Sequence, residues 1–394
     1  MNQDTPRHWI VNAALPVHYQ VRLVDGLLEL DNRALLEAGS TQRKSNPRRL
    51  VVIDANVDRL YGVQLRQYLT HHGVKHHILA LQASETEKTM ESVFTVVKAI
   101  DGFGISRRHE PILAMGGGVL MDIVGLAASL YRRSTPYVRI PTTLIGLVDA
   151  GVGAKTGVNH GAHKNRLGTY FPAKDTLLDR RFLKTLDTRH VVNGLAEILK
   201  IALIKDRTLF ELLERHATSL IEERLQGLTE ESDRAAAQVI ERAITGMLEE
   251  LELNLWEHKL ERVVDYGHSF SPTLEMMALP ELLHGEAVNI DMALSTLLSV
   301  QRGLITPEER DRIFALMRKL ELPLYHRLCS PMLLASALAD TVKHRDGLQR
   351  LPLALGIGAA CFVNDLQPSE LFTALSTLQE LGNVALPERE AAHA

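Results

Sequence analysis

The first half of the chain alternates short β-branched runs with segments of helical spacing, and this alternation constrains the fold more than any other feature. Strand-like runs occur in RRLVVID, KHHILAL, EPILAMG and TPYVRIP, and helical spacing follows the second of them in TMESVFTVVKAIDGFG. Strands that alternate with helices predict a parallel sheet with helices on its faces. Ligands bind beyond the carboxyl ends of the strands in such sheets.

After about Leu183 the pattern changes to long segments with helical spacing, among them HVVNGLAEILKIALIKDRTLFELLERH and GEAVNIDMALSTLLSVQRG. A chain of 394 residues is also too long for one ordinary core. We therefore predict two domains. Residues 1–182 form an α/β domain with a parallel, Rossmann-like sheet, and residues 183–394 form a mainly α-helical domain.

Charge and composition exclude several classes of partner. The formal net charge is −4, so there is no electrostatic reason to expect nucleic acid or an anionic membrane as the partner. The two cysteines, Cys329 and Cys361, form no CxxC pair, which argues against a disulfide framework or a cysteine metal site. The longest apolar stretch contains Asp122 and three glycines, and we do not expect it to span a membrane. The amino-terminal residues show no signal-peptide pattern. A soluble cytoplasmic protein is the expectation.

Three consecutive glycines, Gly116 to Gly118, join a strand-like run to a helical segment. They can serve as a tight turn, or they can expose backbone N–H groups that hold a pyrophosphate at a helix amino terminus. Asp54 and Asn56 follow an earlier strand, where a short acid can accept hydrogen bonds from ribose hydroxyls. These two residues favour the nucleotide interpretation.

Glu197 and Lys200 interrupt a segment that is apolar nearly all round, NGLAEILKIALIK. They are spaced i, i+3 and so lie on one helix face. They can form an internal salt bridge, but a buried carboxylate is also suited to a ligand role. His268 and His284 each adjoin a glycine outside the apolar pattern. Two histidines and one glutamate form a His₂Glu set typical of Zn²⁺ with an open coordination position.

The segment LVDAGVGAKTGVNHGAHKNRLGTYFPAK is rich in glycine, lysine and asparagine and follows neither the helical nor the strand period. We expect a loop that wraps an anionic ligand, with a solvated surface loop as the alternative.

Six ordered motifs between about Val51 and Asp365 together resemble the sugar phosphate cyclases, the family of 3-dehydroquinate synthase. They are GGGVLMDIVG, RIPTTLIGLVDAGVGAKTGVN, HKNRLGTYF, NGLAEILK, GHSFSPTLE and LLHGEAV. The resemblance implies an NAD-binding α/β domain and a helical metal-binding domain with the active site between them. It also implies a homodimer that acts on a small sugar phosphate.

The resemblance assigns roles to individual residues of this chain. Ten positions match the family's NAD contacts: Asp54, Asn56, Glu85, Lys88, Gly117, Gly118, Asp122, Thr142, Thr143 and Asp149. Three match its ligands for Zn²⁺ or Co²⁺: Glu197, His268 and His284. Substrate contacts are implied for Lys155, Lys164, Asn165 and Lys200, and Arg133 matches an arginine that reaches the substrate phosphate of the neighbouring subunit.

Departures from the 3-dehydroquinate synthase pattern bear on the substrate. Glu261, Asp265 and Pro272 stand where those enzymes carry arginine, asparagine and histidine, and His344 replaces a lysine. Since Glu261 would repel a substrate carboxylate, we expect a sugar phosphate without one. Asp265 and His344 are typical of the family branch of 2-epi-5-epi-valiolone synthases, which cyclise sedoheptulose 7-phosphate. In that branch Asp265 would orient hydroxyls, and His344 would place the open chain or relay a proton.

Four alternatives remain open from the sequence. Close relatives make 2-epi-valiolone or desmethyl-4-deoxygadusol from the same heptulose phosphate, and another branch uses a substrate such as glucose 6-phosphate. A metal-dependent polyol dehydrogenase would consume NAD rather than regenerate it. A catalytically silent paralogue should have lost metal ligands or lysines, and this chain retains all of them.

Overall fold

The structure is a computed structural model that describes residues 8–39, 47–161 and 163–382. Its centre is a six-stranded sheet in which every pairing is parallel, with the order β1-β8-β5-β4-β2-β3. The strands are β1 (Gln20–Leu23), β2 (Arg48–Asp54), β3 (Lys75–Leu81), β4 (Ile112–Gly116), β5 (Tyr137–Pro141) and β8 (Asp175–Leu178). The predicted parallel sheet is confirmed.

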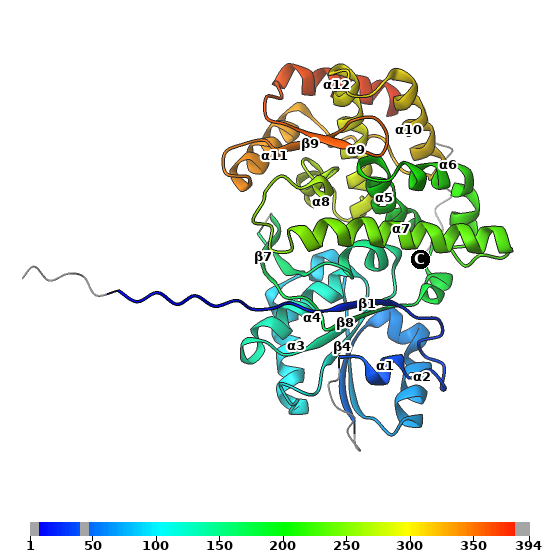
Figure 1. Cartoon of the computed structure of the whole chain (residues 1–394), viewed down its shortest axis with the longest axis vertical. Coiled ribbons are helices and arrows are strands. Elements are labelled where there is room, and N and C mark those ends of the chain that lie inside the picture. The colour runs from blue at the N-terminus through cyan, green and yellow to red at the C-terminus, as the bar shows by residue number, and fades with distance from the viewer. Residues whose placement is uncertain (1–7, 40–46, 162, 383–394) are drawn as a thin grey trace, which may run out of the picture.

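Helices cover the sheet because its central strands are apolar on both faces. Every residue of β4 and β5 is buried, as expected for a sheet packed on two sides. The covering helices are α1 (Ala34–Glu37), α2 (Ala55–His71), α3 (Met90–Phe103) and α4 (Gly118–Leu130). In Figure 1 this α/β part occupies the lower half of the view.

The strand order reverses between β2 and β4, which are neighbours in the sheet although β3 lies between them in the sequence. The chain leaves β2 at Asp54 and β4 at Gly116, so both ends meet at the same edge. A crevice at such a reversal is the usual ligand-binding position in open parallel sheets. The glycine run and Asp54 therefore lie at the expected nucleotide position.

The glycine-rich segment, which we expected to be a loop, forms an antiparallel ribbon of β6 (Lys155–His160) and β7 (His163–Tyr170). Our prediction of an irregular segment was wrong. Thr156 and Val158 are buried, and the ribbon packs on α4. A Cβ at Gly168 would lie 2.3 Å from the Thr156 carbonyl oxygen, so glycine is required where the strands meet. Tertiary packing, rather than local alternation, stabilises this ribbon.

From residue 183 to residue 382 the structure is mainly helical, as predicted. Its helices are α5 (Thr188–Ile204), α6 (Arg207–Glu222), α7 (Glu230–Leu253), α8 (Ser271–Ala278), α9 (His284–Gln301), α10 (Pro307–Lys319), α11 (Pro331–His344) and α12 (Pro368–Gly382). A small hairpin, β9 (Leu351–Ala354) and β10 (Ala360–Val363), is inserted among them. These elements form the upper half of Figure 1, and α7 runs between them and the sheet.

Helices α5 and α9 form the centre of the helical part, since nearly all their residues are buried and the two pack against each other. Within the described residues, no helix has both the length and the apolar character needed to cross a bilayer. The predicted domain boundary at residues 182 and 183 falls inside a 3₁₀ segment, Arg180–Thr185, between β8 and α5. The division into two domains stays a prediction.

Candidate active site

Three side chains from separate segments converge beside the buried helix α5. Glu197 lies on α5, His268 precedes α8, and His284 is the first residue of α9. Glu197 Oε1 is 3.6 Å from His268 Nε2 and 3.4 Å from His284 Nε2. The structure therefore brings the predicted His₂Glu set together, and one ligand atom from each residue lies within 4.8 Å of the others.

The three groups fit a tetrahedral metal ion. Two ligand atoms that each lie about 2.1 Å from Zn²⁺ are separated by roughly 3.4 Å in a tetrahedral site, close to the two separations observed. Both Glu197 oxygens are buried and accept no well-aligned hydrogen bond from the described residues, although Lys200 Nζ lies 2.5 Å from Oε2. A buried carboxylate in this state is suited to a cation. The predicted internal salt bridge and the predicted ligand geometry therefore coexist.

Charge around this cluster keeps Glu197 ionised. Burial favours the neutral acid, but the Lys200 ammonium and the His284 imidazole outweigh it and hold the pKa of Glu197 well below its usual range. Burial lowers the pKa of Lys200, and the carboxylates of Glu197 and Asp149 reverse that effect and raise it. Asp149 therefore interacts electrostatically with Lys200, beside the metal cluster. Burial raises the pKa of the Asp149 carboxyl group.

The two histidines present their Nε2 atoms because their Nδ1 atoms are already engaged. His268 Nδ1 lies 3.0 Å from the Tyr266 carbonyl oxygen, which can only accept a hydrogen bond, so Nδ1 carries the proton. Burial, reinforced by Lys200, lowers the pKa of His268 to about 3, so this ring is neutral. His284 Nδ1 is bonded to Glu275 at 2.8 Å. Despite its burial, the carboxylates of Glu275 and Glu197 raise the pKa of His284 to about 9.

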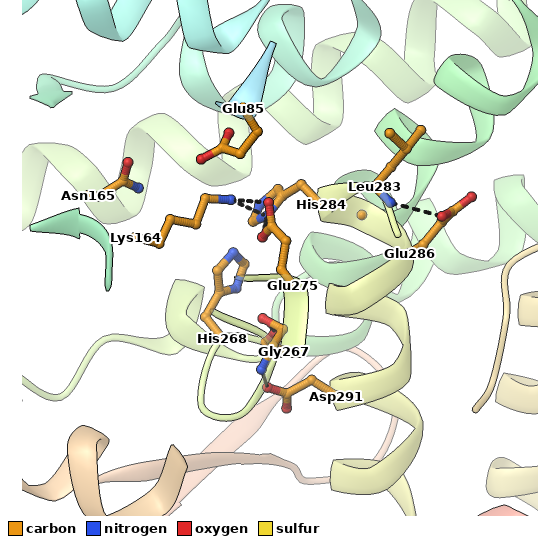
Figure 2. Close-up of polar contacts among 12 residues, drawn as sticks. Glu85, Lys164, Asn165, Gly267, His268, Glu275, Leu283, His284, Glu286 and Asp291 are labelled. Carbon is orange, nitrogen blue, oxygen red and sulfur yellow. Dashed lines mark hydrogen bonds and ion pairs between the residues drawn. The ribbon is translucent and has the colours of Figure 1, made fainter. Parts of the chain in front are cut away.

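The segment that carries His268 is fixed by a buried acid on α9. Asp291 Oδ2 accepts hydrogen bonds from the backbone N–H groups of Phe270 (2.6 Å) and Ser271 (2.8 Å), at the amino terminus of α8. Gly267 adopts a φ of +75° against α9, a conformation suited to glycine. Figure 2 shows Asp291 below the His268 loop and the two imidazoles above it.

Five charged side chains alternate in sign beside the metal cluster. Glu257 lies 2.5 Å from Lys155 and 2.8 Å from Arg262, and Asp265 lies 2.7 Å from Arg262 and 3.4 Å from Arg345. Burial raises the pKa of Asp265, but the three nearby cations outweigh it and the net shift is downward. Asp265 is therefore an anion held at a fixed position near the candidate metal site.

The amino terminus of α4 is suited to the phosphates of a dinucleotide. Gly117 is its N-cap and makes no side-chain cap hydrogen bond, whereas Asp54 caps α2 and Thr89 caps α3. The first N–H groups of α4 are thus left for a ligand. Gly116 to Gly118 have negative φ or extended conformations and are not among the positive-φ glycines, so a left-handed turn is not their purpose. Thr142 Oγ1 is buried nearby in the sheet edge without a hydrogen-bond partner among the described residues.

The remaining predicted NAD contacts lie around this edge, and several already have protein partners. Asp54 Oδ1 accepts from the backbone N–H of Asn56 at 2.8 Å, Asn56 itself being exposed. Thr143 Oγ1 accepts from Gly146 N–H at 3.2 Å. Gly118 approaches Ala150 closely, since a Cβ there would lie 3.0 Å from the Ala150 Cβ.

A second set of predicted NAD contacts joins the dinucleotide edge, which is the carboxyl edge of the sheet at the amino terminus of α4, to the β6–β7 ribbon. Lys88 is buried between Asp122 of α4 (2.6 Å) and Asn165 of β7 (2.6 Å). Burial lowers the pKa of Lys88, but the carboxylates of Asp122 and Glu85 outweigh it and raise it. Glu85 accepts a hydrogen bond from Asn159 at 2.8 Å.

Three residues singled out in the sequence are exposed. Arg133 is exposed after α4 and has a φ of +62°. His344, the last residue of α11, is exposed, and the buried residue beside it is Arg345. Glu261 is also exposed, so the carboxylate that the structure places within the site is Asp265 rather than Glu261.

Sequence reasoning missed Glu275, Glu257 and Arg345. Glu275 is the final residue of the motif GHSFSPTLE and is 2% exposed, which marks it as a buried acid that needs partners. The available signal was an acid within the same motif as His268, seven residues further along the chain. Arg345 directly follows His344, and only burial distinguishes the two.

Both halves of the chain match family models. Residues 78–193 match 3-dehydroquinate synthase N-terminal, and residues 194–344 match 3-dehydroquinate synthase C-terminal. The chain therefore belongs to the 3-dehydroquinate synthase family, and the resemblance noted in the sequence is confirmed.

Relatives within this family include 2-epi-5-epi-valiolone synthases and a demethyl-4-deoxygadusol synthase. It is 61% identical over 374 residues to a 2-epi-5-epi-valiolone synthase of Actinomyces sp., which covers 95% of this chain and 98% of the relative. It is 41% identical to a demethyl-4-deoxygadusol synthase of Trichormus variabilis, over 93% of this chain and 88% of the relative. The solved structure of ValA, the 2-epi-5-epi-valiolone synthase of Streptomyces hygroscopicus subsp. jinggangensis 5008, with NAD⁺ and Zn²⁺ bound, aligns with a TM-score of 0.90 at 58% identity, covering 95% of this chain and all of ValA.

Proposed function

We propose that the protein converts sedoheptulose 7-phosphate into 2-epi-5-epi-valiolone with release of phosphate, as a carbon–oxygen lyase that requires NAD and Zn²⁺ or Co²⁺. The reaction comprises transient oxidation of a ring carbinol, β-elimination of phosphate, reduction, ring opening and intramolecular aldol closure. The observation that carries the proposal is the convergence of Glu197, His268 and His284 in a chain 61% identical to a 2-epi-5-epi-valiolone synthase. The lower identity to a demethyl-4-deoxygadusol synthase favours the valiolone product.

The residues of the site would hold two cofactors, NAD and a divalent metal ion. NAD supplies a reversible hydride acceptor, and the divalent ion supplies a Lewis acid for a coordinated hydroxyl. We assign the metal to the His₂Glu set and the NAD pyrophosphate to Gly117 and Gly118 at the amino terminus of α4. The other predicted NAD contacts are retained in that role.

Positive groups around the ribbon are suited to the substrate phosphate. Lys155 lies on β6 and Asn165 on β7, and we propose that these two residues hold the leaving phosphate together with Arg133, while Lys164 of β7 also contacts the substrate. Lys200 and Asp265 orient hydroxyl groups, because both are charged and held in place by ion pairs. Asp265 also repels a substrate carboxylate, which separates this reaction from that of 3-dehydroquinate synthase.

Three further features belong to the same proposal. We propose a homodimer in which Arg133 reaches the neighbouring active site, consistent with its exposure after α4. We also propose the division into residues 1–182 and 183–394 and a cytoplasmic location. His344 is retained as a candidate for placing the open chain, although its exposure gives Arg345 the stronger geometric case.

The proposal is tested by incubating the purified protein with sedoheptulose 7-phosphate, catalytic NAD⁺ and Zn²⁺ or Co²⁺. Phosphate release and absorbance at 340 nm are followed, and NMR identifies the product. The matched control is Glu197→Gln, which keeps the side-chain shape but weakens the metal site. We expect phosphate release without net NADH, a C7 cyclitol product, and loss of turnover in the variant.

Each other outcome points elsewhere. Stoichiometric NADH without phosphate release would show a polyol dehydrogenase. NMR couplings of 2-epi-valiolone or desmethyl-4-deoxygadusol would reassign the product. Turnover of glucose 6-phosphate but not of the heptulose phosphate would place the chain in another branch of the family.

A further inference from the structure

Glu275 connects the metal cluster to the β6–β7 ribbon. This acid lies on α8, and its Oε2 accepts a hydrogen bond from His284 Nδ1 at 2.8 Å. Its Oε1 lies 2.5 Å from Lys164 Nζ of β7, and Lys164 Nζ also lies 3.1 Å from His284 Nδ1. The side chains of Glu275 and Lys164 are only 3% and 11% exposed, so solvent screens this pair weakly. Figure 2 shows Lys164 and His284 meeting at the Glu275 carboxylate.

The contact with Glu275 sets the orientation of the metal ligand. With Nδ1 directed to the carboxylate, the opposite nitrogen of His284 faces Glu197 at 3.4 Å. A carboxylate at this place fixes the ring and strengthens it as a ligand.

The ribbon continues the connection to the dinucleotide edge. Asn165 follows Lys164 directly in the chain. Its φ of +51° is a left-handed backbone conformation, which restricts the backbone next to Lys164. Asn165 Oδ1 accepts a hydrogen bond from Lys88 Nζ at 2.6 Å, and Lys88 is paired with Asp122 on α4. Two sets of polar contacts, joined by the chain between the consecutive residues Lys164 and Asn165, therefore run from His284 to α4.

We propose that Glu275 and Lys164 couple the two cofactor sites, so that bound metal strengthens NAD binding and bound NAD strengthens metal binding. The inference rests on the proposed function for the identity of the two ligands. A metal ion on His284 fixes Glu275 and, through it, Lys164 and the adjacent Asn165. NAD then binds next to a ribbon that is already ordered, which lowers the entropy lost on binding. Thermodynamic linkage makes the effect equal in both directions.

Binding measurements without any sugar phosphate test the coupling. The dissociation constant of NAD⁺ is measured by calorimetry with and without Zn²⁺, and that of Zn²⁺ by competition with a chromophoric chelator with and without NAD⁺. For the unmodified protein we expect the same factor from both pairs, between about 5-fold and 150-fold. For Glu275→Gln and Lys164→Met we expect a factor near 1, and Glu275→Gln also weakens Zn²⁺ binding about 10-fold to 100-fold.

Glu286→Gln is the matched control. Glu286 is a buried carboxylate two residues beyond His284, but it pairs with Arg189 and caps Leu283 instead of contacting the ribbon. This variant should retain the coupling even if it is less stable. Equal NAD⁺ affinity with and without Zn²⁺ in the unmodified protein would overturn the proposal, as would coupling that persists in Lys164→Met. Lys164 is half of the pair and lies on the ribbon, so its variant answers the question even if Glu275→Gln does not fold.

The outcome is separable from the proposed function. Coupled binding in a protein that does not cyclise sedoheptulose 7-phosphate would sustain this inference and refute the cyclase assignment. Cyclisation by a protein whose two cofactors bind independently would have the opposite meaning.

Discussion

Gly285 places the metal ligand His284 against α5, and enlarging it should open the metal site. A Cβ at this position would lie 2.0 Å from the carbonyl oxygen of Asn193, whereas ordinary contacts begin at 3.4 Å. In Gly285→Ala the first turn of α9 must therefore move away from α5 by about 1.4 Å along this direction. The Gly285 N–H bond to Asn193 Oδ1, 2.6 Å long, would be lost or stretched.

The expected losses follow from these contacts. Overpacking a tight core site costs about 1–3 kcal/mol, and the lost hydrogen bond costs about 1 kcal/mol more. Glu197 is one turn beyond Asn193 on α5, so parting the helices also separates Glu197 from His284. Zinc requires ligands at about 2.1 Å, and we expect its affinity to fall roughly 10-fold to 100-fold.

Chelator competition measures the affinity for Zn²⁺, and denaturant unfolding of the metal-free protein measures stability. The control is Gly102→Ala in α3, where an added Cβ would contact nothing within 4 Å. That change should stabilise the protein by about 0.5–1 kcal/mol. If Gly285→Ala binds Zn²⁺ as tightly as the unmodified protein and unfolds at the same denaturant concentration, the helix-contact argument is refuted.

Three further predictions concern buried or neighbouring charged groups. Burial raises the pKa of Asp291 from 3.8 to about 6, so the native state binds more protons than the unfolded chain in this interval, and the unmodified protein should lose stability relative to Asp291→Asn as the pH rises from 4 to 6. Unfolding titrations across that range would contradict this if the difference between the two proteins stayed constant. Arg139 is fully buried and donates hydrogen bonds to the carbonyl oxygens of Ala150 (3.1 Å) and Lys155 (2.9 Å). Arg139→Met should therefore lower the free energy of unfolding, measured with denaturant, by about 3 kcal/mol or more, and Arg139→Lys should lower it less. Equal losses in the two variants would show that the hydrogen-bond donors are unimportant. Arg345→Met should lower kcat/KM for the heptulose phosphate more than His344→Ala, because Arg345 is buried beside Asp265 whereas His344 is exposed; a larger loss of rate or a changed product epimer in His344→Ala would support His344 instead.

Much of the architecture was readable from local pattern. The β-branched runs predicted β2 to β5, and the helical spacing predicted α5, α6 and α9, because periodicity reports which faces of an element are buried. The ribbon of β6 and β7 was not readable in this way. Its glycines carry no side chains and its exposed positions carry mixed polar groups, so strand alternation is hidden until α4 supplies the surface that buries Thr156 and Val158.

The candidate site shows the same division. The sequence by itself determined the chemical types: a buried acid on an apolar helix, two histidines beside glycines, and lysines in a glycine-rich segment. Only the tertiary structure decided that Glu197 and the two histidines converge, that Glu275 joins His284 to Lys164, and that Arg345 rather than His344 pairs with Asp265. The physical reason is that helix and strand preferences act between near neighbours, whereas these contacts join segments far apart in the chain. Such contacts depend on how whole helices pack, which no local spacing encodes.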